Sequence, residues 1–353
     1  AARQRVAATE ISSQFKIFEN KPHSQRRTHR MNNAIELNRR NFLKTTGAAA
    51  LTASVLGLAG PAAAAPRRWG VGCRDVHLKF VNATDSWAAL KQIGADCFEA
   101  DLNDDLSLSS LVAPGKKSTI ATPEGVAALK ADLKTNKCRI SALCMHNKFD
   151  QRLDQEIVMT TQTVQAAERL GVSTVRLDVV PRALKREEFL PFAIKACRAV
   201  CDATKKSKVR FGIENHGTVT NDPDLMEQLI AGAGAKRLGI TLDTANLYWW
   251  GHPLDAVYRI YERFAPLACH THCKNIAYPA DQRNIKRTMG WEYSKRCCPI
   301  YEGDIDFNRV IAILRKARYQ GDLCVENESL GRFPETERAG ILQKEIAFLR
   351  TLV

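Results

Sequence analysis

The chain has 353 residues, of which 45% are hydrophobic and 25% are charged, a composition typical of a globular protein with a large core. The formal net charge is +14, but residues 1–64 hold ten Lys or Arg and three Glu and so contribute half of it. The remaining excess of about +7 is modest and argues against nucleic-acid binding.

The first 65 residues differ in character from the rest. Residues 1–30 are polar, show no core-forming period and begin with Ala rather than Met, so we interpret them as a non-native upstream segment translated in frame. In residues 31–65, the pair Arg39-Arg40 and the letters N-F-L-K precede an Ala-, Gly- and Leu-rich stretch that ends in four alanines. This order is typical of an export signal and resembles the twin-arginine signal peptide. We expect a periplasmic or other extracytoplasmic location, with a membrane tether only if the signal stays uncleaved.

All eleven cysteines follow this segment, and no C-x-x-C pair occurs. Several fall in predicted strands, where Cys behaves as a small buried hydrophobe. Disulfide connectivity cannot be read from their spacing.

Short β-rich runs alternate with amphipathic helical stretches from residue 66 to the C-terminus. Most of the runs are continuously apolar, as expected of parallel strands covered on both faces. No Gly-rich phosphate turn follows the first run, which disfavours a doubly wound sheet. Eight β/α units predict an α/β fold, a single-domain (β/α)8 TIM barrel over residues 66–353. The predicted strands are 69–74, 97–101, 139–146, 174–179, 210–216, 238–244, 268–274 and 322–328.

Local signals mark the ends of several predicted helices. Apolar stripes predict the last two helices over 304–318 and 334–353. Residues 275–304 form a long irregular insertion whose Trp291 and Tyr293 could belong to a lid. First-turn prolines behind N-cap residues are predicted at Pro123 (Thr122) and Pro223 (Asp222), and left-handed helix ends at Gly171 and Gly321.

The last four predicted strands each end with an ionisable residue, and these are Glu214, Asp243, His272 and Glu326. A charged group on a strand buried on both faces is costly unless it is paired or bound to a metal. Strand ends of a β/α barrel meet at its active-site face. Three carboxylates and one imidazole favour Mn²⁺, Mg²⁺, Co²⁺ or Fe²⁺, while Zn²⁺ stays open.

These strand endings, in this order, resemble the xylose-isomerase-like superfamily of sugar-phosphate isomerases and epimerases. The motifs are I-E-N-H (213–216), L-D-T-A-N (242–246), H-T-H-C-K (270–274) and V-E-N-E (325–328). The resemblance implies that Glu214, Asp243, His272 and Glu326 bind one divalent metal ion, with Mn²⁺ expected first. It also implies that Glu214 and Glu326 form the catalytic acid/base pair.

The chain departs from the epimerase pattern at three places. Asn246 stands where the epimerases have a His, Asn275 replaces the usual acid after H-x-H-x-K, and Tyr278 lies in the stretch where they carry an Arg. These differences leave the substrate and the exact reaction open.

Further polar residues at the predicted strand ends are candidates for substrate binding. For each of them a structural role is the alternative, and Lys274 could instead be a solvated loop residue. The candidates are His216, Asn246, Lys274, His146, Glu99 and His270.

The sequence thus predicts a metal-dependent sugar isomerase or epimerase that works through an enediolate. The expected partner is a small-molecule sugar or keto-sugar, and neither nucleic acid nor stable membrane insertion after signal cleavage is expected; a homo-oligomer is left open. Three alternatives remain: a keto-glycoside lyase or hydrolase on the same metal site, an endonuclease of the apurinic-site type, and a non-catalytic sugar-binding barrel.

Overall fold

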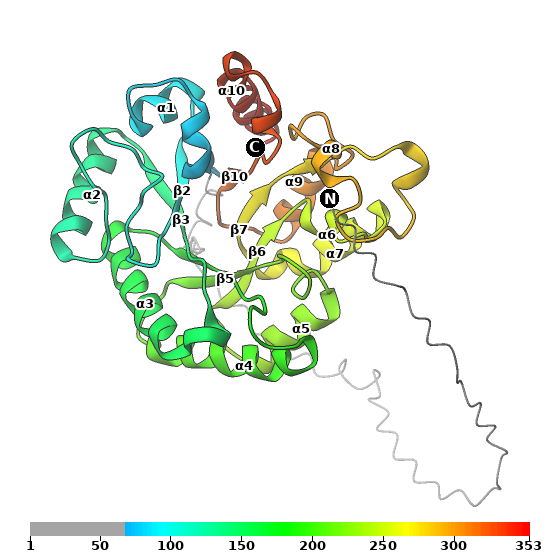
Figure 1. Ribbon diagram of the computed structural model, residues 1–353, viewed down its shortest axis with the longest axis horizontal. Helices are drawn as coiled ribbons and strands as arrows, with labels where there is room; N and C mark the ends of the chain where they lie inside the picture. Colours follow the sequence, from blue (N-terminus) through cyan, green and yellow to red (C-terminus); the bar gives the residue numbers. More distant parts are fainter. Residues whose placement is uncertain (1–67) are drawn as a thin grey trace, which may run out of the picture. The chain divides into compact units, whose positions relative to one another are not determined.

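A closed barrel of eight parallel strands forms the centre of the computed structural model, which describes residues 68–353 (Figure 1). The expected upstream segment (1–30) and signal peptide (31–65) lie outside the described residues. The strands neighbour one another in the order β1-β10-β7-β6-β5-β4-β3-β2 before the barrel closes. They are β1 (Val71–Arg74), β2 (Cys97–Asp101), β3 (Arg139–Cys144), β4 (Thr174–Leu177), β5 (Arg210–Glu214), β6 (Leu238–Asp243), β7 (Ala268–Cys273) and β10 (Leu323–Val325).

The predicted (β/α)8 barrel is therefore confirmed, and each of these strands lies within its predicted range. β2 matches its range at both ends, whereas β10 stops before Glu326. The β10 strand ends at Val325, so Glu326, Asn327 and Glu328 of the V-E-N-E motif lie in a loop. The strands are buried along nearly their whole length, as expected of parallel strands covered on both faces.

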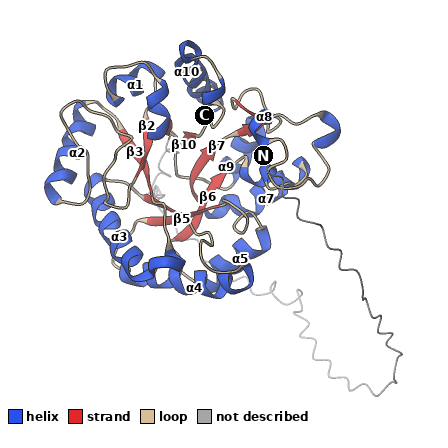
Figure 2. Ribbon diagram, viewed as in Figure 1, coloured by secondary structure: helices blue, strands red, loops and turns tan. Residues whose placement is uncertain are grey.

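Helices surround the barrel on its outer side (Figure 2). Their buried stripes pack against the strands and complete the core. The α-helices are α1 (Ser86–Ile93), α2 (Pro123–Thr135), α3 (Phe149–Leu170), α4 (Arg186–Ala203), α5 (Pro223–Ala233), α6 (Asn246–Trp249), α7 (Leu254–Phe264), α8 (Tyr293–Arg296), α9 (Phe307–Lys316) and α10 (Glu335–Leu352), and the 3-10 helices are η1 (Asp75–Phe80), η2 (Ala265–Leu267), η3 (Ala280–Gln282) and η4 (Leu330–Arg332). None of the helices in 68–353 is both long and apolar enough to cross a membrane.

Most of the predicted helix ends are confirmed. Thr122 and Asp222 are N-caps whose side chains accept backbone hydrogen bonds, and Gly171 ends α3 with φ of 75°. The prediction for Gly321 is wrong, because α9 ends at Lys316 with Ala317 as its C-cap, and the left-handed residue is Arg318, with φ of 57°. Gly321 is instead a close approach, since a Cβ there would lie 2.7 Å from the carbonyl oxygen of Cys269.

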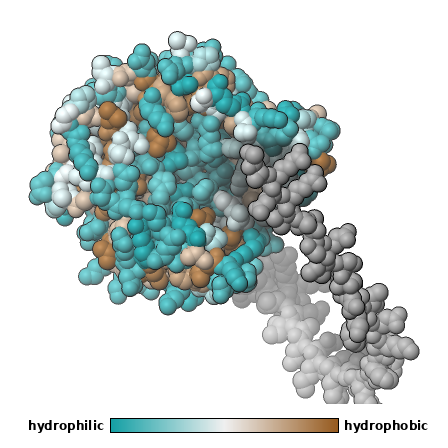
Figure 3. All heavy atoms as spheres, viewed as in Figure 1, coloured by the Kyte–Doolittle hydropathy of each residue, from teal (hydrophilic) through white to brown (hydrophobic). Residues whose placement is uncertain are grey.

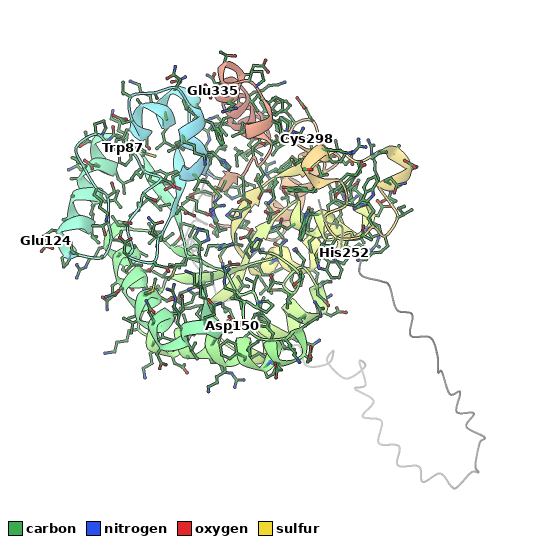
Figure 4. All side chains as sticks on the ribbon, viewed as in Figure 1. Trp87, Glu124, Asp150, His252, Cys298 and Glu335 are labelled. Carbon is green, nitrogen blue, oxygen red and sulfur yellow. The ribbon has the colours of Figure 1, made fainter. Side chains whose placement is uncertain are left out.

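The insertion at 275–304 contains a small hairpin that the sequence did not predict. Its strands, β8 (Asn275–Ile276) and β9 (Cys297–Cys298), pair antiparallel, and Cys298 is labelled in Figure 4. The Arg287 guanidinium lies 4.4 Å from the ring centroid of Tyr248 and 4.3 Å from that of Tyr278, and these two rings pack edge to face with centroids 4.8 Å apart. Arg287 also donates to the backbone oxygens of Tyr248 and His252. One buried side chain thus ties the insertion to the segment after β6.

Candidate functional site

The four residues predicted to bind metal converge at the ends of neighbouring strands β5, β6, β7 and β10. Each offers a ligand atom, and these atoms all lie within 4.8 Å of one another. Glu214 is 3% exposed, Asp243 and His272 are 0% exposed, and Glu326 is 5% exposed. The strand ends thus hold four ionisable side chains close together and away from water.

Glu214 has one oxygen at the periphery of the cluster and one toward its centre. Oε2 accepts from Arg176 Nε at 2.7 Å and also from the Nη2 atom of Arg176. Oε1 lies 3.1 Å from His272 Nδ1 and accepts from Asn246 Nδ2 at 3.2 Å. Burial opposes ionisation of Glu214, but the Arg176 charge and His272 outweigh it and hold the pKa of this carboxyl well below its usual range.

Asp243 is arranged in the same way. Oδ1 accepts from the backbone nitrogens of Ala245 (2.8 Å) and Asn246 (2.7 Å). Oδ2 lies 3.0 Å from Lys274 Nζ as an ion pair, outside hydrogen-bond geometry, and accepts no hydrogen bond from the described residues. Burial raises the pKa of Asp243 to about 7; Lys274 opposes this rise and the neighbouring glutamates add to it.

Glu326 is held on both sides by cations. Oε1 accepts from Arg74 Nη1 at 2.5 Å, and Oε2 lies 3.1 Å from Lys274 Nζ and 3.4 Å from His272 Nδ1. Burial would raise its pKa, but Lys274, His272 and Arg74 together hold it well below the usual range. Lys274 is 4% exposed, so the alternative of a solvated loop lysine is wrong.

Behind His272 lies a buried pair, Glu99 and His270, both 0% exposed. Glu99 Oε2 is 2.7 Å from His272 Nε2 and 2.5 Å from His270 Nε2. An ionised carboxylate can only accept, so Nε2 of His272 carries a proton and Nδ1 faces the cluster. The expectation that Glu99 and His270 line the substrate pocket is not supported by this placement, which puts both in the barrel interior under His272.

Two arginines at the site were missed in the sequence analysis, Arg74 on β1 and Arg176 on β4. Arg74 contacts Glu326, and it also lies 2.7 Å from Asp101 and 3.1 Å from Glu99. Arg176 is 4% exposed inside an otherwise apolar strand. An arginine within an apolar strand was the signal that could have found it, because a buried guanidinium requires a carboxylate partner.

His146 and His216 lie at the rim, with side chains 43% and 47% exposed. His146 Nε2 is 2.7 Å from Asp101, and His216 Nδ1 is 3.0 Å from Asp178. The hydrogen bond to Asp178 raises the pKa of His216, and burial partly opposes this. Hydrophilic residues predominate over the centre of the face drawn in Figure 3. Both imidazoles are available to a ligand, although neither contacts the four-residue cluster.

The insertion reaches the site through Tyr293. Its hydroxyl donates to Glu328 Oε2, and Glu328 Oε1 lies 3.1 Å from Lys274 Nζ. Trp291 packs on Tyr278, with ring centroids 5.6 Å apart. The segment predicted to form a lid therefore contacts the polar side chains beside the cluster. Tyr248 is 0% exposed and donates to Asp304, so its ring is packed in the interior.

The donor set fits a divalent cation. Three carboxylates and one imidazole offer hard and borderline ligand atoms, and Oδ2 of Asp243, which accepts no hydrogen bond from the described residues, is a buried acceptor within the cluster. Glu214, Asp243, His272 and Glu326 would hold the ion.

Fold and site together define a β/α barrel with a carboxylate–histidine centre at the ends of its strands. Residues 87–352 match the model of the xylose isomerase-like TIM barrel family, so the chain belongs to this family. Residues 36–55 match the twin-arginine translocation signal sequence, which supports export by that route. No curated protein matches the sequence.

Solved structures with a similar fold share little sequence with the chain. The IOLI protein with a bound zinc atom is 14% identical, with a TM-score of 0.58 over 79% of this chain and 97% of its own. The D-allulose 3-epimerase from Methylomonas sp. in complex with D-allulose is 13% identical, with a TM-score of 0.56 over 82% and 98%. The probable 3-DHS dehydratase AsbF from Bacillus anthracis is 14% identical, with a TM-score of 0.54 over 79% and 98%. These likenesses show the fold.

Proposed function

We propose that this protein is a divalent-metal-dependent isomerase or epimerase of sugars or keto-sugars, acting outside the cytoplasm. The observation that carries the proposal is the convergence of Glu214, Asp243, His272 and Glu326, with the two glutamates on strands separated by β6 and β7. The epimerase with bound D-allulose among the similar structures supports a sugar as the substrate. The zinc atom in the IOLI protein supports a metal in this fold, and Mn²⁺ remains our first expectation.

A bound divalent cation would polarise a substrate carbonyl and stabilise the negative charge that develops on its oxygen when the neighbouring carbon loses a proton. One glutamate accepts that proton, and the electron pair of the C–H bond moves into the enediolate. The other glutamate returns a proton, on the opposite face for epimerisation or at the adjacent carbon for isomerisation. Lys274, next to Asp243 and Glu326, is placed to donate to a substrate oxygen.

The test uses the purified full chain, a panel of keto-sugars and aldoses in D2O with Mn²⁺ added, and NMR detection. We expect deuterium to enter at the carbon next to the carbonyl, together with an epimer or isomer of one sugar. Glu214→Gln and Glu326→Gln should each lower the rate by about 100-fold or more. Glu335→Gln is the control, since the Glu335 side chain is 89% exposed at the start of α10 (Figure 4).

Other outcomes separate the alternatives. Loss of a substituent next to the exchanging carbon would favour the keto-glycoside lyase, and metal-dependent cleavage of DNA at apurinic sites would favour the endonuclease. Binding of a sugar without proton exchange would leave the non-catalytic barrel. A protein that neither contains nor binds divalent metal contradicts the proposal.

A further inference from the structure

Each of the four candidate ligands has one polar atom held at the periphery and one toward the centre, where Lys274 Nζ lies 3.0 Å from Asp243 Oδ2 and 3.1 Å from Glu326 Oε2. Backbone nitrogens hold Asp243 Oδ1, and Glu99 holds His272 Nε2. Arg176 holds Glu214 Oε2, and Arg74 holds Glu326 Oε1. The atoms left toward the centre are Glu214 Oε1, Asp243 Oδ2, His272 Nδ1 and Glu326 Oε2.

The two arginines bracket the cluster along the barrel wall. β1 lies next to β10 on one side, and β4 lies next to β5 on the other. Each guanidinium is also held in place by a second interaction. Arg74 also pairs with Asp101 and Glu99, and Arg176 Nη1 donates to the Met145 carbonyl at 2.8 Å.

We infer that Arg74 and Arg176 are positioning residues that restrict Glu326 and Glu214 to one oxygen each toward the cation. A carboxylate without such a partner can turn and bind a cation through both oxygens. With four single-atom ligands, about two positions of a six-coordinate ion stay open, which suits a substrate that binds through a carbonyl and an adjacent hydroxyl. The inference rests on the proposed metal centre and adds two residues that determine its geometry.

Cobalt(II) titration of the purified full chain, followed by visible absorption, tests this without measuring turnover. Arg74→Met and Arg176→Met should each weaken Co²⁺ binding by about 10- to 100-fold and change the shape of the absorption bands. Arg263→Met is the matched control. Arg263 pairs with Asp224 at 2.9 Å and with Glu227, two exposed side chains of α5 that are partners of neither the four ligands nor the two arginines, so this variant should match the wild type.

Arg74→Lys and Arg176→Lys keep the charge and decide the question if a methionine variant does not fold. Lysine lacks the fork of the guanidinium, so we expect an altered spectrum here also. Guanidinium ion at millimolar concentration should restore the wild-type spectrum in Arg74→Met and Arg176→Met and leave the spectrum of Arg263→Met unchanged. Folded arginine variants with wild-type affinity and spectrum would overturn the inference while the proposed function stands. A wild type that binds no Co²⁺, Mn²⁺ or Zn²⁺ would overturn both.

Discussion

Glu345 on α10 is a buried carboxyl, 0% exposed, that forms no ion pair with the other described residues. It accepts from the backbone nitrogen of Ile300 at 2.9 Å and from Asn327 Nδ2 at 3.0 Å. Burial raises its pKa to about 8, against the lowering effect of these two hydrogen bonds. Between the ordinary pKa and about 8, the folded chain therefore keeps a proton that the unfolded chain has released.

The sign of the resulting pH dependence follows from this difference in bound protons. The contribution of Glu345 to the free energy of unfolding should fall as pH rises from about 5 to 8, because this carboxyl binds fewer protons in the unfolded state there. Glu345→Gln cannot ionise, so its stability relative to wild type should increase over this window by on the order of 2–4 kcal/mol and level off above it. Urea unfolding at pH 5, 6, 7 and 8 measures the effect, and a pH-independent difference would contradict it.

Gly72 in β1 makes a second prediction at the level of one residue. A Cβ there would lie 1.8 Å from the backbone oxygen of Cys97 in β2, where no side chain can move aside. Gly72→Ala should therefore lower stability by about 3 kcal/mol, measured by denaturant unfolding, or prevent soluble expression. Gly331→Ala is the control, because a Cβ there meets nothing within 4 Å, and its stability should stay within about 1 kcal/mol of wild type.

The residues of the candidate metal site could be predicted from the sequence only where a local pattern marks them. Glu214, Asp243, His272 and Glu326 are ionisable residues at the ends of predicted strands, so each could be predicted on its own. Arg74 and Arg176 also lie in predicted strands, but the carboxylate that each one reaches could not be predicted, because it depends on contacts between strands that are distant in sequence. Whether the four bind a metal stays a prediction.

Among the elements, the insertion at 275–304 depends on Arg287 more than on its own secondary structure. Arg287→Met removes the guanidinium that contacts the rings of Tyr248 and Tyr278 and leaves the backbone oxygens of Tyr248 and His252 without this donor. We expect hydrogen exchange in the insertion to speed up by about tenfold or more, while the barrel strands keep their protection.

Hydrogen-exchange mass spectrometry of wild type and variant measures this difference. Lys295→Met is the control within the same segment, since the Lys295 side chain is 74% exposed. Equal protection of the insertion in Arg287→Met and wild type would show that other contacts hold it.

The elements that could be predicted are those with a clear local signal. Apolar runs mark most of the barrel strands, apolar stripes mark α9 and α10, and N-cap residues followed by proline mark the starts of α2 and α5. The β8–β9 hairpin has two residues in each strand, too few to show an alternating pattern, and its pairing is long-range. The end of α9 was misplaced because Gly321 serves a close approach rather than a helix cap.

At the scale of the whole molecule, the chain combines a barrel with an export signal. The twin-arginine signal is a receptor-read address that depends on its arginine pair. Replacing Arg39 and Arg40 with Lys should therefore leave the precursor in the cytoplasm, as measured by fractionation and immunoblotting. The purified variant barrel should keep the wild-type thermal unfolding midpoint. Normal export of the double-lysine variant would contradict the assignment.

The twin-arginine export route has a chemical consequence for the eleven cysteines. All are free thiols in the structure, nine of them buried and the other two, Cys138 and Cys298, only partly exposed. Burial raises their pKa, for Cys269 to about 11, and a thiol that rarely ionises is a poor partner in disulfide exchange. A chain that crosses the membrane already folded meets extracytoplasmic oxidants with these sulfurs shielded. The same chain threaded across the membrane unfolded would present all eleven thiols at once and accumulate scrambled cross-links, so we expect export in the folded state to protect it against oxidative misfolding.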